Sequence, residues 1–404
     1  MYYYDKICYN LSGDFMDVIV VGGGASGMTA AINSKRYGNN VTIIEKNNIL
    51  GKKLLLTGNG RCNYYNDNMN INNFYSNKDV SRFVNEDNLN KVKELFDSVG
   101  IIPRIKDGYY YPYSNISNAI QNSLLTEINN LNIKIINEEV IDIDKNNKFI
   151  IKTNNNYYEC DKLILSTGGI TYPKTGSDGF GYKILKKFNH NIITPKPALV
   201  PLISNENVKE WKGIRVNSNI KLYINNKFIT EEAGEIQLTD YGISGICIMN
   251  LSRFINKENK NTIVIDFIPN INNLLEFINN RNNKLLNRNI IELLECLLNY
   301  KLLYFILRKI HINPDNNWDN LTNKEKELLV NSLKSYKLNI IDTNDENYGE
   351  TTCGGLDLDE INNNCESKKV NNLFITGEIL DIDGKCGGYN LTIAWITGIL
   401  AGEK

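Results

Sequence analysis

The stretch DVIVVGGGASG, residues 17–27, decides the fold class of this 404-residue chain. Residues 17–21 form a run rich in β-branched side chains, which is typical of a strand buried in a parallel sheet. Residues 25–37 then have a helix-like pattern, and residues 41–44 form a second apolar run. The sequence therefore predicts a βαβ unit whose first turn is rich in glycine.

The glycines of this turn have the spacing of a dinucleotide-binding site. Gly22 would allow the tight turn, Gly24 would let a pyrophosphate approach the backbone, and Gly27 would let the helix pack closely on the strand. The helix N-terminus would offer free N–H groups and a partial positive charge to phosphates. Glu45 ends the second strand, where a carboxylate can accept hydrogen bonds from ribose and would disfavour a 2′-phosphate. NAD and FAD both remain possible, and an unliganded α/β turn is the alternative.

Composition and charge limit the class of protein. The length predicts two or three domains at about 150 residues each. Lys and Arg total 45 against 46 Asp and Glu, and this balance argues against a general nucleic-acid binder. The eight cysteines form no C-x-x-C pair and there are two histidines, so we expect no metal site. Without a signal peptide or an apolar run of about 20 residues, we expect a soluble, cytoplasmic protein that does not associate with membranes.

The pattern along the chain changes twice. Helical patterns occupy residues 80–99 and 118–130, and strand patterns occupy residues 133–136, 140–144, 148–153 and 163–165. From about residue 194 to residue 267 short alternating strands predominate, and residues 271–334 are helical in pattern. Strands return at residues 338–341 and 373–376, before a last helix that begins near Asn390. The middle of the chain therefore looks like an insertion that interrupts one α/β domain.

A resemblance to a known family rests on five further stretches. LGKKLLLTGNGRCN at residues 50–63 is similar to the signature of a bacterial FAD-binding family that includes aminoacetone oxidase-like enzymes and flavin-dependent reductases of dehydro-bile acids. The other stretches are STGG at 166–169 leading to YPKTGS at 172–177, PALVPL at 197–202, GEIQLT at 234–239 leading to GISG at 242–245, and TGEILDIDG at 376–384 leading to GGYNL at 387–391. Together the matches run from about Asp17 to Gly402. One departure is Ile246-Cys247, where the family often has proline, and it weakens any transfer of substrate identity.

The resemblance implies a Rossmann-like α/β FAD-binding domain interrupted by an inserted β-barrel domain with a helical subdomain. Residues 1–15 are rich in Tyr and have neither a helical nor a strand period, so we expect a weakly ordered leader there, with Met16 as an alternative start. The FAD-binding domain would comprise residues 16–193 and 349–404, the barrel residues 194–269 and 336–348, and the helical subdomain residues 270–335. We expect the insertion to cover the flavin.

The cofactor implied is non-covalent FAD, and no catalytic residue is assigned. The glycine turn and the resemblance together give these candidate FAD-binding residues: Gly22, Gly24, Ala25, Ser26, Gly27, Glu45, Lys46, Lys53, Thr57, Gly58, Gly60, Arg61, Cys62, Asn63, Val140, Thr167, Gly168, Gly169, Gly377, Glu378, Asp383, Gly388, Tyr389, Asn390 and Leu391.

Several of these residues have a simpler alternative. Arg61 would hold phosphates or the flavin edge, or it would only cap a helix. Cys62 is interpreted as a packing residue, with an active thiol as the alternative. Asn390 would lie at a helix N-terminus that approaches the flavin, or it would be a plain N-cap. His190 and His311 have no motif around them and are expected at the surface or in packing.

The leading functional hypothesis is an FAD-dependent oxidoreductase with hydride transfer through flavin N5, most simply an oxidase that acts on a small amine such as an aminoketone. The first alternative is an NAD(P)H-dependent reductase of an activated C=C bond, without a separate NAD(P) domain. The alternative from another class is a non-catalytic flavin-binding module. The partners expected are a small-molecule substrate and no nucleic acid, with the oligomeric state left open.

Overall fold

The computed structural model describes residues 15–285 and 287–403. The predicted leader falls outside the described residues apart from Phe15. The chain divides into two compact units, the first comprising Met1–Pro197 and Gly349–Lys404 and the second comprising Ala198–Tyr348. Each unit has its own buried apolar core.

A five-stranded parallel sheet forms the centre of the first unit, in the order β20-β11-β1-β2-β7. Its strands are β1 (Asp17–Val21), β2 (Asn40–Ile44), β7 (Lys134–Ile136), β11 (Lys162–Leu165) and β20 (Leu373–Ile375). In β1 all residues after Asp17 are buried, as expected for a strand covered on both faces. The predicted βαβ unit is therefore present.

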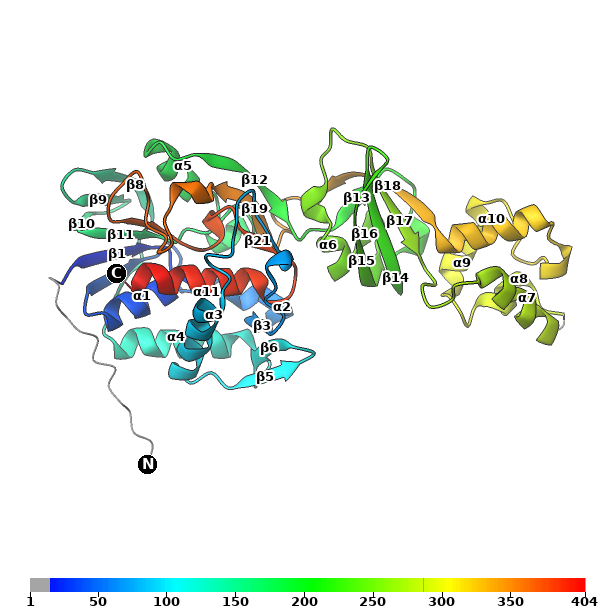
Figure 1. Cartoon of the computed structure of the whole chain (residues 1–404), viewed down its shortest axis with the longest axis horizontal. Helices are drawn as coiled ribbons and strands as arrows, with labels where there is room; N and C mark the ends of the chain where they lie inside the picture. The colour runs from blue at the N-terminus through cyan, green and yellow to red at the C-terminus, as the bar shows by residue number, and fades with distance from the viewer. Residues whose placement is uncertain (1–14, 286, 404) are drawn as a thin grey trace, which may run out of the picture. The chain divides into compact units, whose positions relative to one another are not determined.

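Two helices from opposite ends of the sequence pack side by side on this sheet. They are α1 (Ala25–Arg36) and α11 (Tyr389–Gly402), drawn in blue and red in Figure 1. A Cβ atom at Gly398 would lie 2.5 Å from the Ser26 carbonyl oxygen, and one at Gly402 would lie 2.7 Å from that of Ala30. These glycines therefore let the two helices approach closely. Because α11 is buried on nearly all sides, its sequence is apolar without a polar face.

The first unit contains further helices and strands around this sheet. The helices are α2 (Thr57–Gly60), α3 (Glu86–Ser98), α4 (Ser117–Asn130) and α5 (Phe180–Lys187). The strands are β3 (Tyr65–Asn66), β4 (Phe74–Tyr75), β5 (Pro103–Lys106), β6 (Tyr109–Pro112), β8 (Val140–Lys145), β9 (Phe149–Thr153), β10 (Tyr157–Cys160), β12 (Ile192–Ala198), β19 (Thr351–Leu356) and β21 (Asp383–Gly384). The helix predicted from residue 80 was placed too early. It begins at Glu86, because the Asn85 side chain accepts the Asn88 N–H and caps the helix there.

The second unit contains a closed antiparallel barrel in the order β13-β16-β15-β14-β17-β18. Its strands are β13 (Leu202–Ser204), β14 (Arg215–Ile224), β15 (Lys227–Leu238), β16 (Gly242–Ser244), β17 (Asn261–Asp266) and β18 (Tyr336–Thr343). Alternate residues such as Ile220, Leu222, Ile263 and Ile265 are fully buried, which matches the period of two in the sequence. A short helix α6 (Ile246–Met249) follows β16.

The helical region predicted at residues 271–334 consists of separate short helices. They are α7 (Leu274–Lys284), α8 (Ile290–Leu294), α9 (Tyr300–Lys309) and α10 (Asn323–Lys334). Each begins after an Asn or Thr whose side chain accepts a backbone N–H of the first turn, namely Asn273, Asn289, Asn299 and Thr322. The predicted fold class, a Rossmann-type domain interrupted by a barrel and helices, is confirmed. The division of the insertion at residues 270 and 335 stays a prediction.

Within residues 15–285 and 287–403, no helix combines the length and the hydropathy that crossing a bilayer requires. The same residues contain no group of three or more His, Cys, Asp or Glu side chains placed to bind a metal ion.

Candidate functional site

The glycine loop between β1 and α1 has the shape that its sequence predicts. Gly22 has φ +100°, and a Cβ atom there would lie 2.4 Å from the Ser166 carbonyl oxygen. A Cβ atom at Gly27 would lie 1.9 Å from the carbonyl oxygen of Gly22. At Gly24, by contrast, a Cβ atom would meet no described atom within 4 Å. Gly22 and Gly27 are therefore required by packing, whereas Gly24 leaves open space beside the backbone.

The N-terminus of α1 is suited to an anion. In the described structure no side chain caps the helix at Gly24, and its first turn contains no acidic residue. Its first N–H groups and its partial positive charge are therefore available to a phosphate. The Ser26 hydroxyl instead donates to the Thr376 carbonyl oxygen at 3.4 Å, so this side chain joins α1 to the end of β20. Ala25 lies beside it, half-buried.

Glu45 holds the loop in place. Its carboxylate is buried, and Oε2 accepts the Gly23 N–H at 2.7 Å. Oε1 accepts the backbone N–H of Asn47 at 2.8 Å and its side-chain amide at 2.6 Å. A ribose hydroxyl would therefore share this carboxylate with the loop itself. Lys46 forms an ion pair with Asp178 at 2.6 Å, so its ammonium already has a partner.

Residues 57–61 form a compact turn around glycines with positive φ. Gly58 has φ +57° and Gly60 has φ +76°, and the Thr57 hydroxyl donates to the Leu54 carbonyl oxygen at 2.7 Å. The Arg61 Nε donates to the Gly58 carbonyl oxygen at 3.2 Å. The exposed guanidinium also lies 5.4 Å from the centre of the Tyr111 ring. In this structure Arg61 thus caps the turn, which was the simpler of its two interpretations.

Cys62 and Asn63 continue this segment into the core. The Cys62 side chain is fully buried, and burial raises the pKa of its thiol to about 12. Such a thiol stays protonated at neutral pH, which favours the packing interpretation over an active thiol. The Asn63 amide, oriented to match its neighbours, donates to the carbonyl oxygens of Tyr65 and Tyr110 at 2.9 and 3.0 Å.

A closed polar network joins Lys53 to Glu378. The Lys53 Nζ lies 2.6 Å from Glu378 Oε2 and donates to the Thr171 hydroxyl at 2.8 Å. Glu378 Oε1 accepts from the hydroxyls of Thr171 and Thr352, at 2.9 and 2.8 Å. A Cβ atom at Gly169 would lie 2.1 Å from the Thr352 hydroxyl oxygen, so glycine is needed there. Four segments far apart in the sequence meet at this network.

Thr171 and Thr352 were not among the residues predicted from the sequence. A usable signal for Thr352 was its position just before Gly354-Gly355, both of which have positive φ. A glycine pair of this kind marks a close approach of backbone segments. Thr171 has no comparable local signal.

Two buried hydroxyls in the segment between β11 and α5 support the presence of a polar ligand. Among the described residues, Thr167 Oγ1 and Ser177 Oγ are buried without a hydrogen-bond partner. Gly168 lies beside Ser177, since a Cβ atom on it would approach Ser177 Oγ to 2.7 Å, and a Cβ atom on Gly181 would approach Thr167 Oγ1 to 2.1 Å. Buried polar atoms are normally paired, so these hydroxyls fit a group that a bound ligand would supply.

The C-terminal motif forms the turn that leads into α11. Gly377 N–H donates to the Thr397 hydroxyl at 3.0 Å, and Gly388, with φ +88°, is the N-cap of α11. Asn390 is therefore not the N-cap, which corrects that interpretation. Its side chain accepts the Gly384 N–H at 2.8 Å, donates to the Gly384 carbonyl oxygen at 2.9 Å and accepts from Thr351 at 3.3 Å. Asn390 thereby holds the turn against the start of β19.

The remaining candidates of this motif pack around the turn. The Tyr389 ring meets the Phe74 ring edge-on at 5.4 Å, and Asp383 is buried in β21 opposite Tyr75. Leu391 is partly buried against the core. Val140 is buried in β8, which belongs to the separate three-stranded sheet β10-β9-β8, where it pairs with Thr153.

His190 belongs to a buried cluster that resembles a hydrolase triad. Its Nε2 lies 3.0 Å from the Ser367 hydroxyl, and its Nδ1 lies 2.8 Å from Glu360 Oε2. However, the side chain is completely buried, and the Ser367 oxygen already accepts the N–H groups of Lys369 and Val370. A nucleophile must reach its substrate, so this cluster holds a turn together. The packing interpretation of His190 is therefore supported.

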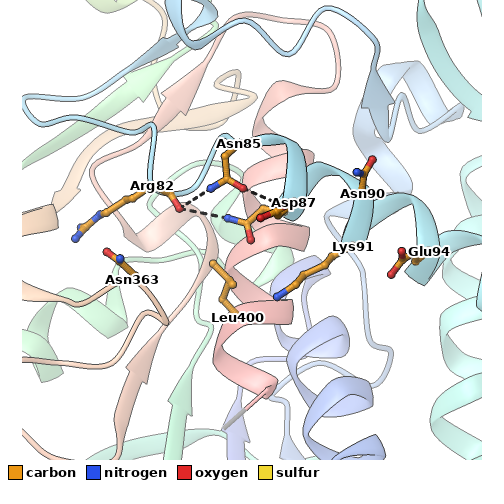
Figure 2. Close-up of a pocket in the computed structure, with 9 residues that line it drawn as sticks. Arg82, Asn85, Asp87, Asn90, Lys91, Glu94, Asn363 and Leu400 are labelled. Carbon is orange, nitrogen blue, oxygen red and sulfur yellow. Dashed lines mark hydrogen bonds between the residues drawn. The ribbon is translucent and has the colours of Figure 1, made fainter. Parts of the chain in front are cut away.

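A separate pocket of about 560 Å³ lies at the N-terminal part of α3. Figure 2 shows its lining, which contains Arg82, Asn85, Lys91, Asn363 and Leu400 among other side chains. The amides of Asn85 and Asn88 donate to the Arg82 carbonyl oxygen, so much of its polarity is satisfied within the wall. None of the candidate cofactor residues lines it.

Comparison with known proteins identifies the family. The family described as "HI0933-like protein Rossmann domain" matches residues 16–404. The chain belongs to this family. It is 32% identical over 399 residues to the 3-dehydro-bile acid delta(4,6)-reductase of Clostridium scindens. The matched region covers 95% of this chain and 97% of that protein. It is also 26% identical over 388 residues to the ribosomal RNA dihydrouridine synthase of Escherichia coli, covering 94% and 95%.

Among solved structures, the 3-ketosteroid-delta4-(5alpha)-dehydrogenase of Rhodococcus jostii is similar with a TM-score of 0.48 and 12% identity, covering 97% of both chains. The protein of the present structure is a flavoprotein and an FAD-dependent oxidoreductase. It is thus an enzyme rather than a flavin-binding module without catalytic activity.

The residues present fit FAD. The uncapped N-terminus of α1 and the open space at Gly24 suit the pyrophosphate, and the unpaired hydroxyls of Thr167 and Ser177 suit a polar part of the cofactor. The assignment of individual residues to parts of FAD remains a proposal.

Proposed function

We propose that this protein reduces a C=C bond conjugated with a carbonyl group in a small molecule, with NADH or NADPH as the electron donor. The observation that carries this proposal is the 32% identity, over almost the whole chain, to a delta(4,6)-reductase of a 3-dehydro-bile acid. In such a compound the ring ketone is conjugated with the double bonds. The dihydrouridine synthase is consistent with the same class, because dihydrouridine is uridine with its ring C=C bond reduced.

The charge distribution favours a small molecule over RNA. The whole chain has a net charge of −1, and residues 198–348 contain 18 basic and 18 acidic side chains. An enzyme that holds an RNA backbone needs an excess of Lys and Arg to replace the counterions of the phosphates. Neither the chain nor its inserted unit has this excess.

The chain's own residues would bind and orient the cofactor. Bound FAD would supply hydride transfer at its N5 atom. The N–H groups of α1 would hold the pyrophosphate, and Glu45 would fix the loop that presents them. The N-terminus of α11, which begins after Gly388, would place a partial positive charge beside the flavin and favour its anionic reduced form. Lys53 and Glu378 would hold the surrounding segments together.

The test uses the purified yellow protein under anaerobic conditions. We expect NADH or NADPH to bleach the flavin, and cyclohexenone or the 3-dehydro-bile acid to restore its colour. Free FAD at the same concentration is the control for non-enzymatic reduction. Peroxide formed with an aminoketone in air, and no bleaching by either nicotinamide, would favour the amine oxidase, which was the leading hypothesis from the sequence. Recolouring by uridine-containing RNA alone would contradict the small-molecule proposal.

The same preparation tests how the cofactor is held. We expect acid precipitation to release FAD into the supernatant, because neither histidine lies in a candidate cofactor segment. Yellow colour retained in the pellet would contradict non-covalent binding, and release of FMN would contradict a dinucleotide.

A further inference from the structure

Glu350 combines two properties that rarely occur together in a carboxylate. It directly precedes β19, and its side chain is exposed to solvent. Nevertheless the protein surrounds it closely enough that burial raises the pKa of its carboxyl above the usual range. A group that solvent can reach and that protein atoms surround lies in a recess. A substrate that enters this recess can therefore touch Glu350.

Cys386 faces Glu350 from the C-terminal motif. Its Sγ lies 3.8 Å from Glu350 Oε2 and donates to it. Cys386 directly precedes Gly387 and Gly388, which lead into α11, and Asn390 accepts a hydrogen bond from Thr351, the residue after Glu350. The carboxyl is thus fixed beside the turn at which α11 begins, inside the candidate cofactor site.

The charges around Glu350 leave it able to keep a proton. The titratable groups that face it are Cys386, Lys53 and Tyr172. Lys53 would favour the ionised form, but its ammonium is paired with Glu378 at 2.6 Å. Burial outweighs the two groups that lower the pKa, the Cys386 thiol and the Lys53 charge. The neutral carboxyl is therefore favoured to a higher pH than in water.

The neighbouring groups are poorer proton donors. Burial raises the pKa of the Cys386 thiol far above its usual range, and its hydrogen already points at Glu350. Burial and the nearby Glu350 likewise raise the pKa of Tyr172. Glu378 accepts from Lys53, Thr171 and Thr352, so its oxygens act as acceptors.

We propose that Glu350 donates the proton of the reduction and that Cys386 positions it; this inference rests on the proposed function. Reduction of a conjugated C=C bond adds a hydride to the carbon β to the carbonyl and a proton to the α carbon. The hydride and both electrons originate from NADH or NADPH, which is oxidised. The O–H bond of Glu350 breaks, its electron pair stays on the carboxylate, and a C–H bond forms at the α carbon. Water then returns a proton to Glu350.

The first test needs no turnover. Infrared spectra of the FAD-loaded protein should contain a protonated-carboxyl band that disappears as the pH rises and that is absent from Glu350→Gln. Glu159→Gln, at an exposed position in β10, is the matched control and should keep the band. A spectrum of Glu350→Gln identical to that of the wild type at every pH would overturn the proposal.

The second test separates the two half-reactions by rapid mixing. In Glu350→Gln, NADPH should reduce the flavin at the wild-type rate, whereas reoxidation by cyclohexenone should slow roughly 100- to 10,000-fold, as for loss of a general acid. Wild-type reoxidation should fall as the pH rises through the pKa of Glu350, and the variant should lack this fall. Cys386→Ala should shift this pH profile, and Cys386→Ser should restore it.

The outcomes distinguish this proposal from the proposed function. If the wild type reduces neither cyclohexenone nor the 3-dehydro-bile acid, the proposed function fails, while the infrared titration still reports on Glu350. Wild-type reoxidation in Glu350→Gln would overturn the role of Glu350 alone. Glu350→Asp, which keeps the acid, should retain FAD and recover part of the reoxidation rate, and so guards against a variant that fails to fold.

Discussion

Alanine at Gly24 and alanine at Gly27 should impair different properties, although the two positions are only three residues apart. At Gly24 the new methyl group enters open space and the apo protein should fold normally. At Gly27 it would lie 1.9 Å from a backbone oxygen that cannot move without opening the loop. We therefore expect Gly24→Ala to lose FAD affinity alone and Gly27→Ala to lose stability.

The magnitudes follow from the backbone conformation and the contacts. Gly24 has φ −75° and ψ −169°, which alanine adopts without strain. The gain of about 0.4–1 kcal/mol from a less flexible unfolded chain is offset by the poorer N-cap, so the stability of the apo protein should change little. Gly27→Ala should cost at least about 1–3 kcal/mol, as for an overpacked core.

The loss of FAD affinity in Gly24→Ala comes from the pyrophosphate. The methyl group would occupy the space through which a phosphate reaches the first N–H groups of α1. Loss of one charge-assisted hydrogen bond costs about 1.5–3 kcal/mol, which is roughly a ten- to 150-fold rise in Kd.

Two measurements on the apo protein test this pair. Urea unfolding gives the stability of each variant, and quenching of FAD fluorescence gives its Kd. The reasoning is refuted if Gly24→Ala binds FAD like the wild type, because the open space would then not face the cofactor. It is also refuted if Gly27→Ala is as stable as Gly24→Ala.

Three other changes test separate parts of the structure. Glu45→Ala should weaken FAD binding by about 1–3 kcal/mol, because the Gly23 N–H loses its hydrogen-bond acceptor. Turnover at saturating FAD should stay near normal. Fluorescence titration measures the affinity and steady-state rates measure the turnover, and low turnover at saturating FAD would contradict this role. Burial lowers the pKa of His190, so its neutral form stabilises the fold above about pH 6.5, and this stability is lost as the pH falls through the lowered pKa. The melting temperature of His190→Asn should therefore depend less on pH between 7 and about 5 than that of the wild type; equal slopes would exclude this role. Lys162→Met should lower the free energy of unfolding in urea by about 1–3 kcal/mol. The reason is that the buried ammonium donates to the Ala401 carbonyl oxygen at 2.7 Å, near the end of α11. An unchanged free energy of unfolding would show that this contact contributes nothing.

The sequence was most informative where structure is local. The strand at residues 17–21, the glycine loop and α1 follow from the order of residues along one short segment, and each was predicted nearly to the residue. The start of α3 was misplaced because residues 80–84 are apolar enough to extend a helical pattern. The cap at Asn85 overrides that pattern.

The parts that could not be predicted depend on contacts between distant segments. Thr171, Thr352 and Lys53 lie far apart in the sequence and meet only because β11, β19 and the loop after β2 converge on Glu378. Asn390 was assigned to the helix start, but its contacts with the Gly384 backbone and with the distant Thr351 determine its orientation. Glu350 has no motif around it, and its role emerges only from its surroundings in three dimensions.

The packing of α11 against α1 has a consequence for biosynthesis. The glycine loop at residues 22–27 is made before the inserted unit, whereas Gly377, Gly388 and the rest of the C-terminal motif are made after it. The inserted unit is continuous in sequence and can fold while residues 349–391 are still being translated. Until residues 389–402 have been made, the nascent chain therefore exposes the apolar surface that α11 will cover and carries only part of the proposed flavin site.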